Sequence, residues 1–335
     1  MPAFTDIPAY VRDAFTPQMR RVVEHQLDRL NGRADSGGDT IEAARAEYRD
    51  ERSFWNVGGP VMHETRDTRI RAAGRDVPVR IHRPRAADAL PAIVYLHGGG
   101  FTVGDLDTHD RITRVLADVS GAAVVAVDYA LAPEAVFPQA LHETAGIVAH
   151  LAAHGEQFGI DGGRLALAGD SAGAMLSLGS TLLLRDEPER VGDEAARAFA
   201  SIRAMLLYYG GYGLADSVSA RLYGGFWDGM GADELGTISE VYLTDAVDRQ
   251  SPYVNHLSAD LDAPLPAAYV IGAELDPLRD ATVALGARLE IAGQDVSWRV
   301  VPGVLHSFLH FGRMLDEANE VLAAGAMFAR RRLME

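Results

Sequence analysis

The sequence contains no cysteine and no lysine. All 31 of its basic residues are arginine. Without a thiolate, the chain cannot form disulfides, thiolate-bound zinc sites or iron–sulfur clusters. Without a lysine amine, it cannot carry Schiff-base or pyridoxal-phosphate chemistry, and it has no Walker P-loop. Any covalent catalysis by this chain therefore needs a different nucleophile, such as a hydroxyl.

Positive charge is scarce relative to negative charge, and long apolar runs are missing. The 47 acidic residues outnumber the 31 arginines, which gives a formal net charge of −16. An acidic chain without a basic stripe does not attract a phosphate backbone, so we expect no nucleic-acid partner. The first residues lack the pattern of a signal peptide, and no later stretch reaches the roughly 18 apolar residues of a membrane helix. We therefore expect a cytoplasmic protein without membrane insertion.

Short apolar runs alternate with longer helical patterns along most of the chain. A strand with one exposed face is predicted around Val77, Val79 and Ile81, whose side chains alternate with polar ones. Apolar strands separated by helices indicate a mostly parallel, doubly wound α/β sheet, with ligand sites at the carboxyl ends of its strands. The other predicted strands span residues 92–96, 122–127, 165–168, 202–207, 267–271 and 296–301.

Two predicted helices precede the sheet. The first starts at the dipeptide Thr16-Pro17, which provides a capping hydroxyl and a proline suited to the first helical position. The second starts at Asp39 or Thr40, after a glycine-rich loop, and ends near Arg52. The two helices therefore occupy about the first fifty residues of the chain.

A segment rich in glycine and aromatic residues, 210–245, interrupts the alternation of strands and helices. Its composition favours an insertion that folds over the sheet edge together with the N-terminal helices, and a plain long crossover is the alternative. We therefore expect a helical cap formed by 1–52 and 210–245. The catalytic α/β core is expected to consist of 53–209 and 246–335.

A GxSxG motif follows one of the predicted strands. The apolar run 165–168 leads into Gly169-Asp170-Ser171-Ala172-Gly173, and a helical pattern follows. This is the context of a nucleophile elbow, in which glycines allow a sharp turn that lifts the serine hydroxyl above the sheet. The N-terminus of the new helix directs free N–H groups and its positive dipole end toward the same place. Ser171 is therefore the candidate nucleophile.

A second glycine motif, His97-Gly98-Gly99-Gly100, follows the predicted strand at 92–96. Consecutive glycines let backbone N–H groups approach a developing alkoxide, as an oxyanion hole requires. We expect the N–H groups of Gly99, Gly100 and Ala172 to be the donors. The alternative is a flexible glycine loop without this role, and His97 itself is expected to be structural.

A serine hydroxyl needs a histidine base that is oriented by a carboxylate. The last predicted strand is followed by His306, which is preferred over His310 because it lies nearer the strand end. The strand at 267–271 is followed by several acids. We prefer Asp276 as the orienting acid, with Glu274 and Asp280 as its rivals.

A histidine pair elsewhere offers a weaker signal. His150 and His154 lie one turn apart on a predicted helix and could hold a metal ion. An exposed helix face is the favoured interpretation, because no HExxH motif is present. We therefore expect neither a metal nor a cofactor.

The motifs occur together, at 97–100, 128–129, 131–134, 137–138, 169–173, 274–280 and 306–308. In this combination they resemble the hormone-sensitive-lipase-like family of bacterial carboxylesterases, which has the α/β-hydrolase fold. The resemblance implies the triad Ser171, Asp276 and His306, and it decides the choice of acid. It also implies a cap built from the N-terminal helices and the insertion. Because many members dimerise through their last strands, a homodimer is a candidate assembly.

The sequence departs from the family pattern at two places. Ala130 stands where the family motif has an arginine that helps to hold the adjoining loop. Ala174-Met175 replace a small glycine and a polar residue after the elbow. Neither change affects the triad. Both leave helix packing, the pocket floor and substrate choice open.

The sequence therefore predicts a serine carboxylesterase that hydrolyses small-molecule esters through an acyl-enzyme. Phe101, Tyr223, Phe226 and Trp227 are candidates to line the acyl or alcohol pocket, and packing within the cap is the alternative for each. An aromatic cap favours short to medium acyl chains. The alternative functions are a non-catalytic small-molecule-binding relative, and an acyltransferase or amidase with the same triad.

Overall fold

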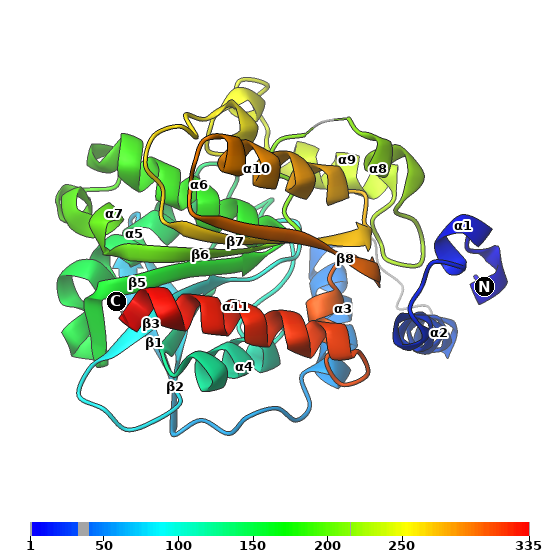
Figure 1. Cartoon of the computed structure of the whole chain (residues 1–335), viewed down its shortest axis with the longest axis horizontal. Coiled ribbons are helices and arrows are strands. Elements are labelled where there is room, and N and C mark those ends of the chain that lie inside the picture. Colours follow the sequence, from blue (N-terminus) through cyan, green and yellow to red (C-terminus); the bar gives the residue numbers. More distant parts are fainter. Residues whose placement is uncertain (1, 33–39, 215, 335) are drawn as a thin grey trace.

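The computed structural model describes residues 2–32, 40–214 and 216–334 (Figure 1). Its centre is an 8-stranded sheet with the order β1-β2-β4-β3-β5-β6-β7-β8. β1 and β2 are antiparallel to their neighbours, whereas β3 to β8 run parallel. The predicted α/β class with a mostly parallel sheet is confirmed. The strands are β1 Glu64–Ala72, β2 Arg75–Arg83, β3 Leu90–Leu96, β4 Ala123–Val127, β5 Ile160–Asp170, β6 Ile202–Tyr208, β7 Ala267–Leu275 and β8 Val296–Leu305.

The edge strand β1 has no counterpart among the predicted strands. Most of its residues are polar and exposed, and burial begins only near its end, where Ile70 pairs with Val77 of β2. A solvent-facing edge strand has no apolar run to reveal it. β2 does match the predicted alternation, because Val77, Val79 and Ile81 are its buried apolar residues.

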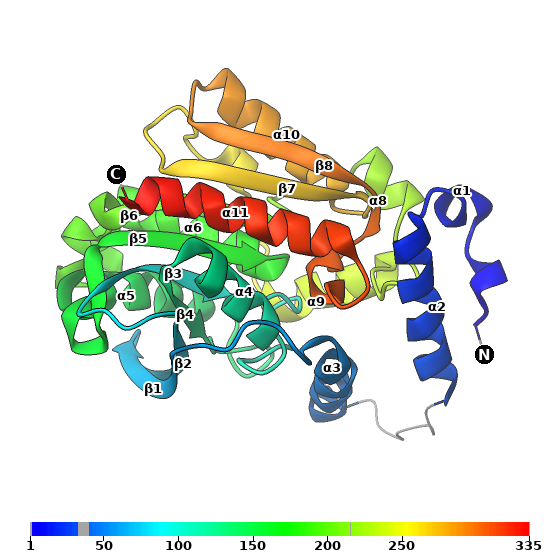
Figure 2. The same cartoon turned by 60° about the horizontal axis from the view of Figure 1, so that its bottom comes forward.

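Helices cover both faces of the sheet (Figures 1 and 2). α5 and α6 pack against each other on one face, and α4 and α11 lie side by side on the other. Among the described residues, no helix combines the length and the apolar character needed to cross a membrane. The core helices are α4 Asp110–Ser120, α5 Gln139–His154, α6 Ala172–Asp186, α7 Ala198–Ser201, α10 Arg279–Ile291 and α11 Asp316–Met334.

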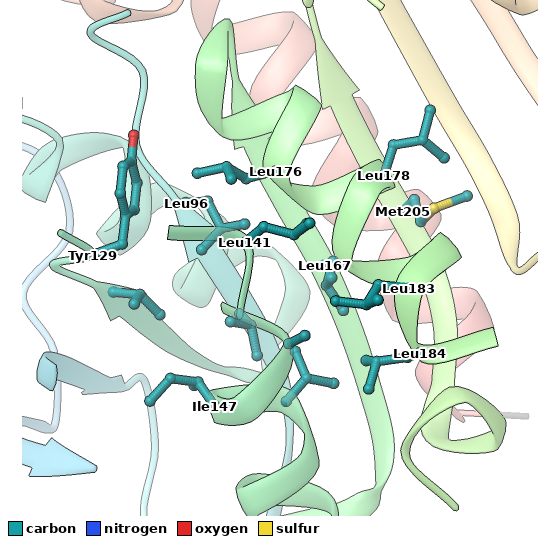
Figure 3. Packing of buried hydrophobic residues seen from close by; sticks show 14 of the residues in the cluster. Leu96, Tyr129, Leu141, Ile147, Leu167, Leu176, Leu178, Leu183, Leu184 and Met205 are labelled. Atoms are coloured by element: carbon teal, nitrogen blue, oxygen red, sulfur yellow. The ribbon is translucent and has the colours of Figure 1, made fainter. Parts of the chain in front are cut away.

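Alternate side chains of the central strands enter separate cores on the two faces. In β3, Val94 and Leu96 belong to one core, whereas Ile93 and Tyr95 belong to the other. Figure 3 shows part of the first core, where Leu96 and Leu167 of the sheet lie near leucines of α5 and α6. A fully buried large apolar side chain stabilises the fold by about 1.5 to 3 kcal/mol. Burial on both faces therefore fixes the positions of the strand ends.

The N-terminal segment forms α1 Ala9–Arg12, α2 Pro17–Gly32 and α3 Ile41–Trp55. Both longer helices begin at the hydroxyl caps suggested by the sequence. Thr16 Oγ1 accepts a hydrogen bond from the Met19 N–H at 3.1 Å, and Thr40 Oγ1 accepts one from the Ala43 N–H at 3.2 Å. Asp39, the alternative start of the second helix, lies outside the described residues.

The segment 210–245 contains α8 Val218–Leu222 and α9 Ala232–Tyr242. It lies with α2 and α3 at the end of the sheet where the parallel strands terminate (Figure 1). The Tyr10 hydroxyl donates to the carbonyl oxygen of Leu222 at 2.6 Å, which joins the N-terminal segment to α8. The Ser219 hydroxyl donates to the Pro277 carbonyl at 2.9 Å, which joins α8 to the loop after β7. We refer to 1–52 and 210–245 as the cap segments.

Candidate active site

Ser171 lies at the turn between β5 and α6, where its backbone has φ 53° and ψ −119°. Its N–H donates to the carbonyl oxygen of Tyr208 at 2.8 Å, which fixes the turn against β6. A non-glycine residue with positive φ costs about 1 to 3 kcal/mol and persists only where its surroundings hold it. The strained turn places Ser171 at the edge where the parallel strands end, as the nucleophile elbow requires.

Close packing explains the glycines of the GxSxG motif. A Cβ atom on Gly173 would overlap the carbonyl oxygen of Leu96, and one on Gly169 would overlap the backbone of Gly173. A side chain at either position would push α6 away from the sheet. The glycines therefore fix the position of Ser171 relative to β3.

His306 and Asp276 reach Ser171 from the ends of β8 and β7. The Nε2 atom of His306 lies 2.9 Å from the Oγ atom of Ser171, and its Nδ1 atom lies 2.8 Å from Oδ2 of Asp276. The Asp276 side chain is buried, and its other oxygen accepts a hydrogen bond from the Leu278 N–H at 2.7 Å. Hydroxyl, imidazole and carboxylate thus form one chain of contacts, the arrangement of a base-activated nucleophile.

The pKa of His306 is raised above its ordinary value. Burial lowers this pKa, but the negative charge of Asp276 and its hydrogen bond to the imidazole outweigh burial. The charge of Asp228, in a cap segment, acts in the same direction. Burial raises the pKa of Asp228 itself to about 7. The environment of His306 therefore makes its imidazole a stronger base.

The rival acids have other partners. The Oε2 atom of Glu274 accepts a hydrogen bond from the Gly303 N–H at 2.7 Å, so this carboxylate braces β8. The Oδ2 atom of Asp280 accepts one from the Ser219 N–H at 2.8 Å, so this carboxylate holds α8. Asp276 is the acid whose hydrogen bond to His306 the structure shows.

The loop after β3 brings Gly99 and Gly100 to the cavity that contains Ser171 and Ala172. Both glycines have positive φ, at 120° and 59°. Within the described part of the chain, no protein acceptor takes the N–H groups of Gly99, Gly100 or Ala172. The sequence-predicted donors are therefore available to a ligand oxygen.

The side chain of Asp170 stabilises this loop through a hydrogen bond. Its buried carboxylate accepts hydrogen bonds from the Gly98 N–H at 2.9 Å and from the Tyr95 hydroxyl at 2.7 Å. Burial raises the pKa of Asp170, but the charge and hydrogen bond of His109 outweigh burial and hold this pKa well below its usual range. His310 packs edge-on against His109, with ring centroids 4.5 Å apart. His310 is therefore part of the buried cluster of side chains around Asp170. Sequence reasoning gave Asp170 no role, although it is part of the GxSxG motif.

A cavity of about 860 Å³ adjoins Ser171 and is lined by core and cap residues. In its wall, the ring of Phe101 stacks on Tyr242 of α9, with centroids 3.8 Å apart and planes 3° apart. Trp227 lines the cavity and is largely buried, and Phe226 lines it while remaining 41% exposed. The cap segments thus contribute aromatic side chains to the cavity that contains Ser171.

Tyr223 is the predicted pocket residue that the structure places elsewhere. It is not among the residues that line the cavity. Its ring lies 6.5 Å from that of Tyr10, and the Arg279 guanidinium lies 5.2 Å from its centroid. The lining also includes residues outside the motifs, namely Leu27, Leu30, Tyr48, Asp228, Leu243 and Val254, and Leu278 within the motif at 274–280, for which no pocket role was predicted.

The positions that depart from the family pattern have distinct surroundings. Ala174 is buried in α6, and Met175 lines the cavity. Ala130 lies after β4, and its N–H donates to the buried Glu143 carboxylate at 2.8 Å. The substitution at Met175 therefore bears on the cavity, whereas Ala130 bears on the loop beside it.

The histidine pair on α5 meets a glutamate at the surface. The Nε2 atom of His154 lies 2.8 Å from Oε1 of Glu194, and the Nδ1 atom of His150 lies 3.7 Å from Oε2. Such exposed groups are common without a bound ion. The contact between His154 and Glu194 accounts for the arrangement.

Comparisons with known proteins agree with this geometry. A family model described as the α/β-hydrolase fold matches residues 93–310. An acetyl esterase of Salmonella agona is 39% identical over 327 residues, which cover 98% of this chain and 97% of that protein. An esterase of Pyrobaculum calidifontis is 32% identical, with a TM-score of 0.83 and coverage of 95% and 98% of the two chains. A thermostable esterase of Pseudomonas putida is 25% identical, with a TM-score of 0.85 and coverage of 96% and 98%.

Fold and sequence similarity together define an α/β hydrolase. The chain belongs to this family, and the predicted resemblance to the hormone-sensitive-lipase-like carboxylesterases is confirmed. Its enzyme class is that of the carboxylic ester hydrolases.

Proposed function

We propose that the protein is a serine carboxylesterase in which Ser171 is the nucleophile, His306 the general base and acid, and Asp276 the orienting carboxylate. The observation that carries this proposal is the chain of hydrogen bonds from Ser171 through His306 to Asp276 at the cavity. Gly99, Gly100 and Ala172 supply the backbone N–H groups for the oxyanion.

In the first half of the reaction, His306 Nε2 takes the proton of Ser171 Oγ while this oxygen attacks the ester carbonyl carbon. The carbonyl oxygen becomes an alkoxide, and the N–H groups of the oxyanion hole stabilise its charge. Asp276 stays ionised and holds the imidazole in the tautomer that presents Nε2 to Ser171. The tetrahedral intermediate collapses, the imidazolium gives its proton to the departing alcohol, and an acyl-enzyme remains.

In the second half, His306 takes a proton from a water molecule, and the resulting hydroxide attacks the acyl carbon. A second tetrahedral intermediate forms in the same oxyanion hole. Its collapse releases the carboxylic acid and returns the proton from His306 to Ser171. The enzyme is then ready for another ester.

Short acyl groups are the proposed preference. The Salmonella relatives are acetyl esterases, and the similarity extends over nearly the whole chain. The stacked rings of Phe101 and Tyr242 form an aromatic wall beside the oxyanion loop. We propose that this wall limits the acyl side, while the remaining cavity receives the alcohol. The acyl and alcohol parts of the substrate therefore contact different segments.

A series of p-nitrophenyl esters tests the proposal, with the acyl chain lengthened in steps of two carbons from acetate. The specificity constant, kcat/KM, is expected to be highest at acetate to butyrate and to fall with longer acyl chains. A maximum at decanoate or beyond would overturn the acyl preference. Absence of hydrolysis across the whole series would overturn the function itself.

A further inference from the structure

Arg45, in the cap helix α3, reaches across to the core beside the proposed active site. Its Nε atom donates to the Thr102 carbonyl at 2.9 Å, and Nη2 donates to the Ala132 carbonyl at 3.0 Å. The same guanidinium forms a forked pair with Glu134, at 2.7 Å for each oxygen. The Arg45 side chain is only 17% exposed. One cap residue thus connects two core loops that are far apart in sequence.

The residues that accept these hydrogen bonds through their carbonyl groups also contact the oxyanion loop, residues 99–101. The Thr102 N–H donates a hydrogen bond to the Gly99 carbonyl at 3.1 Å. The Ala132 N–H donates a hydrogen bond to the Phe101 carbonyl at 2.8 Å. The residues whose carbonyl groups Arg45 contacts are therefore themselves hydrogen-bonded to the segment that lines the cavity.

This segment needs external support because its backbone is strained. Gly99, Gly100 and Phe101 follow one another with φ of 120°, 59° and 62°. The left-handed region is unfavourable for Phe101, and residues held there return to other conformations when their contacts are lost. Ala130, in the neighbouring loop, presents only a methyl group, so this position supplies no cation to bind the carbonyls. Arg45 supplies one from the cap.

We propose that Arg45 is a positioning residue of the oxyanion hole. Through its contacts with the Thr102 and Ala132 carbonyls, Arg45 holds Gly99 and Gly100 at the correct distance from Ser171. This inference rests on the proposed function. Its consequence is that the cap acts on the chemical step as well as on substrate access. Because the oxyanion forms only in the transition state, loss of Arg45 lowers kcat far more than it weakens substrate binding.

Arg49 provides a matched control on the same helix. It lies one turn after Arg45, and its Nε atom donates to the Asp105 carboxylate. Asp105 also accepts the N–H groups of Thr108 and Asp107, at 2.9 Å and 3.0 Å. Arg49 therefore anchors α3 to the core through Asp105, whereas Arg45 does so through the Thr102 and Ala132 carbonyls and Glu134. A purely structural anchoring role predicts similar effects of substitution at both arginines.

The experiment compares Arg45→Met and Arg49→Met with the unchanged enzyme, using p-nitrophenyl acetate and a trifluoromethyl ketone that forms a tetrahedral adduct. Removing one oxyanion donor outright costs about 10² to 10³ in rate, so displacing the loop is expected to lower kcat about tenfold to a hundredfold. KM should stay within about twofold, and the Ki of the ketone should rise in parallel with the fall in kcat/KM. Arg49→Met should leave kcat and Ki within about twofold.

Thermal midpoints of both variants separate misfolding from mispositioning. If Arg45→Met does not fold, Arg45→Lys is measured instead, because an ammonium keeps the charge but not the forked contacts. A kcat for the folded Arg45 variant equal to that of the Arg49 variant would overturn the inference. So would a rise in KM that accounts for the whole loss of kcat/KM. If the unchanged enzyme hydrolyses no ester, the proposed function fails instead.

Discussion

The sheet edge and the cap segments contribute to the same cavity, but the edge is formed by the ends of paired strands, whereas the cap segments are helices and loops outside the sheet. Ser171, Asp276 and His306 follow strand ends that are buried on both faces of the sheet. The cap segments bury side chains such as Met19 and Tyr242 in the same two cores, and they add individual polar contacts, such as Arg45 with Glu134 and Ser219 with the Pro277 carbonyl. We therefore expect the sheet edge, which carries the proposed reacting groups, to be the more rigid of the two regions.

We expect this difference to separate the chemical step from substrate selectivity. Residues on the sheet edge are held within the distances that proton transfer requires, and a small displacement there is costly. The cap side of the cavity contains the exposed Phe226. We expect substitutions at the edge to remove activity, and substitutions in the cap to alter its rate or preference.

The largest expected effect is that of Ser171→Ala. Removing the nucleophile of a triad lowers turnover by roughly four orders of magnitude or more. The measurement is kcat for p-nitrophenyl acetate, with the thermal midpoint as a control for folding. A folded variant that kept more than a tenth of the activity would show that the sheet edge does not supply the nucleophile.

Asp276→Asn should come next. The amide preserves the shape of the side chain but favours the wrong imidazole tautomer, and a comparable change in another triad costs about 10⁴ in kcat. Glu274→Gln is the matched control on the same strand end, and it should retain kcat within about threefold because Glu274 contacts the Gly303 N–H. Equal losses in the two variants would contradict the choice of Asp276.

Stability should distinguish the two regions as well. Leu183 is fully buried in α6, so Leu183→Ala is expected to lower the free energy of unfolding by about 2 to 5 kcal/mol. Phe226 is 41% exposed in a cap segment, and Phe226→Ala should change that free energy by less than about 1 kcal/mol. Urea unfolding curves give both values. A greater loss at Phe226 would mean that the cap is an integral part of the core.

The smallest effect concerns pH. His306 must be neutral to accept the Ser171 proton, so kcat/KM falls as the pH drops through the pKa of His306. Because Asp276 and Asp228 raise this pKa against the effect of burial, the midpoint of the acid limb should lie above the ordinary histidine value of about 6.5. Asp228, whose own pKa is about 7, is only partly ionised in this range, so Asp228→Asn should move the midpoint to lower pH by a small amount. An unchanged or higher midpoint would contradict this electrostatic coupling.

The sequence predicted the sheet edge better than the cap because edge residues follow patterns that local physics enforces. The apolar run before Ser171, the close-packed Gly169 and Gly173, and the glycines after β3 are all visible as motifs. The hydroxyl caps Thr16 and Thr40 likewise predicted where α2 and α3 begin. Each of these signals depends on neighbours within a few residues along the chain.

The remaining features depend on contacts between distant segments. Arg45 meets Glu134 across 89 positions, and nothing in the helix around Arg45 marks it as different from the neighbouring arginines. Tyr223 was predicted to line the pocket because it is an aromatic residue of the segment 210–245, but its ring packs against Tyr10 and Arg279. Asp228 gave no signal, because its effect on His306 exists only once the cap is placed. Such contacts are set by tertiary structure and leave no local pattern.

Labelling with a fluorophosphonate, followed by mass spectrometry of the intact protein and its peptides, tests the central claim most directly. A chain without cysteine or lysine offers few competing nucleophiles, so the adduct is easy to assign. The account predicts one adduct per chain, located on Ser171, with loss of esterase activity in proportion to labelling. A stoichiometric adduct on another residue, or full activity in a chain labelled at Ser171, would contradict it.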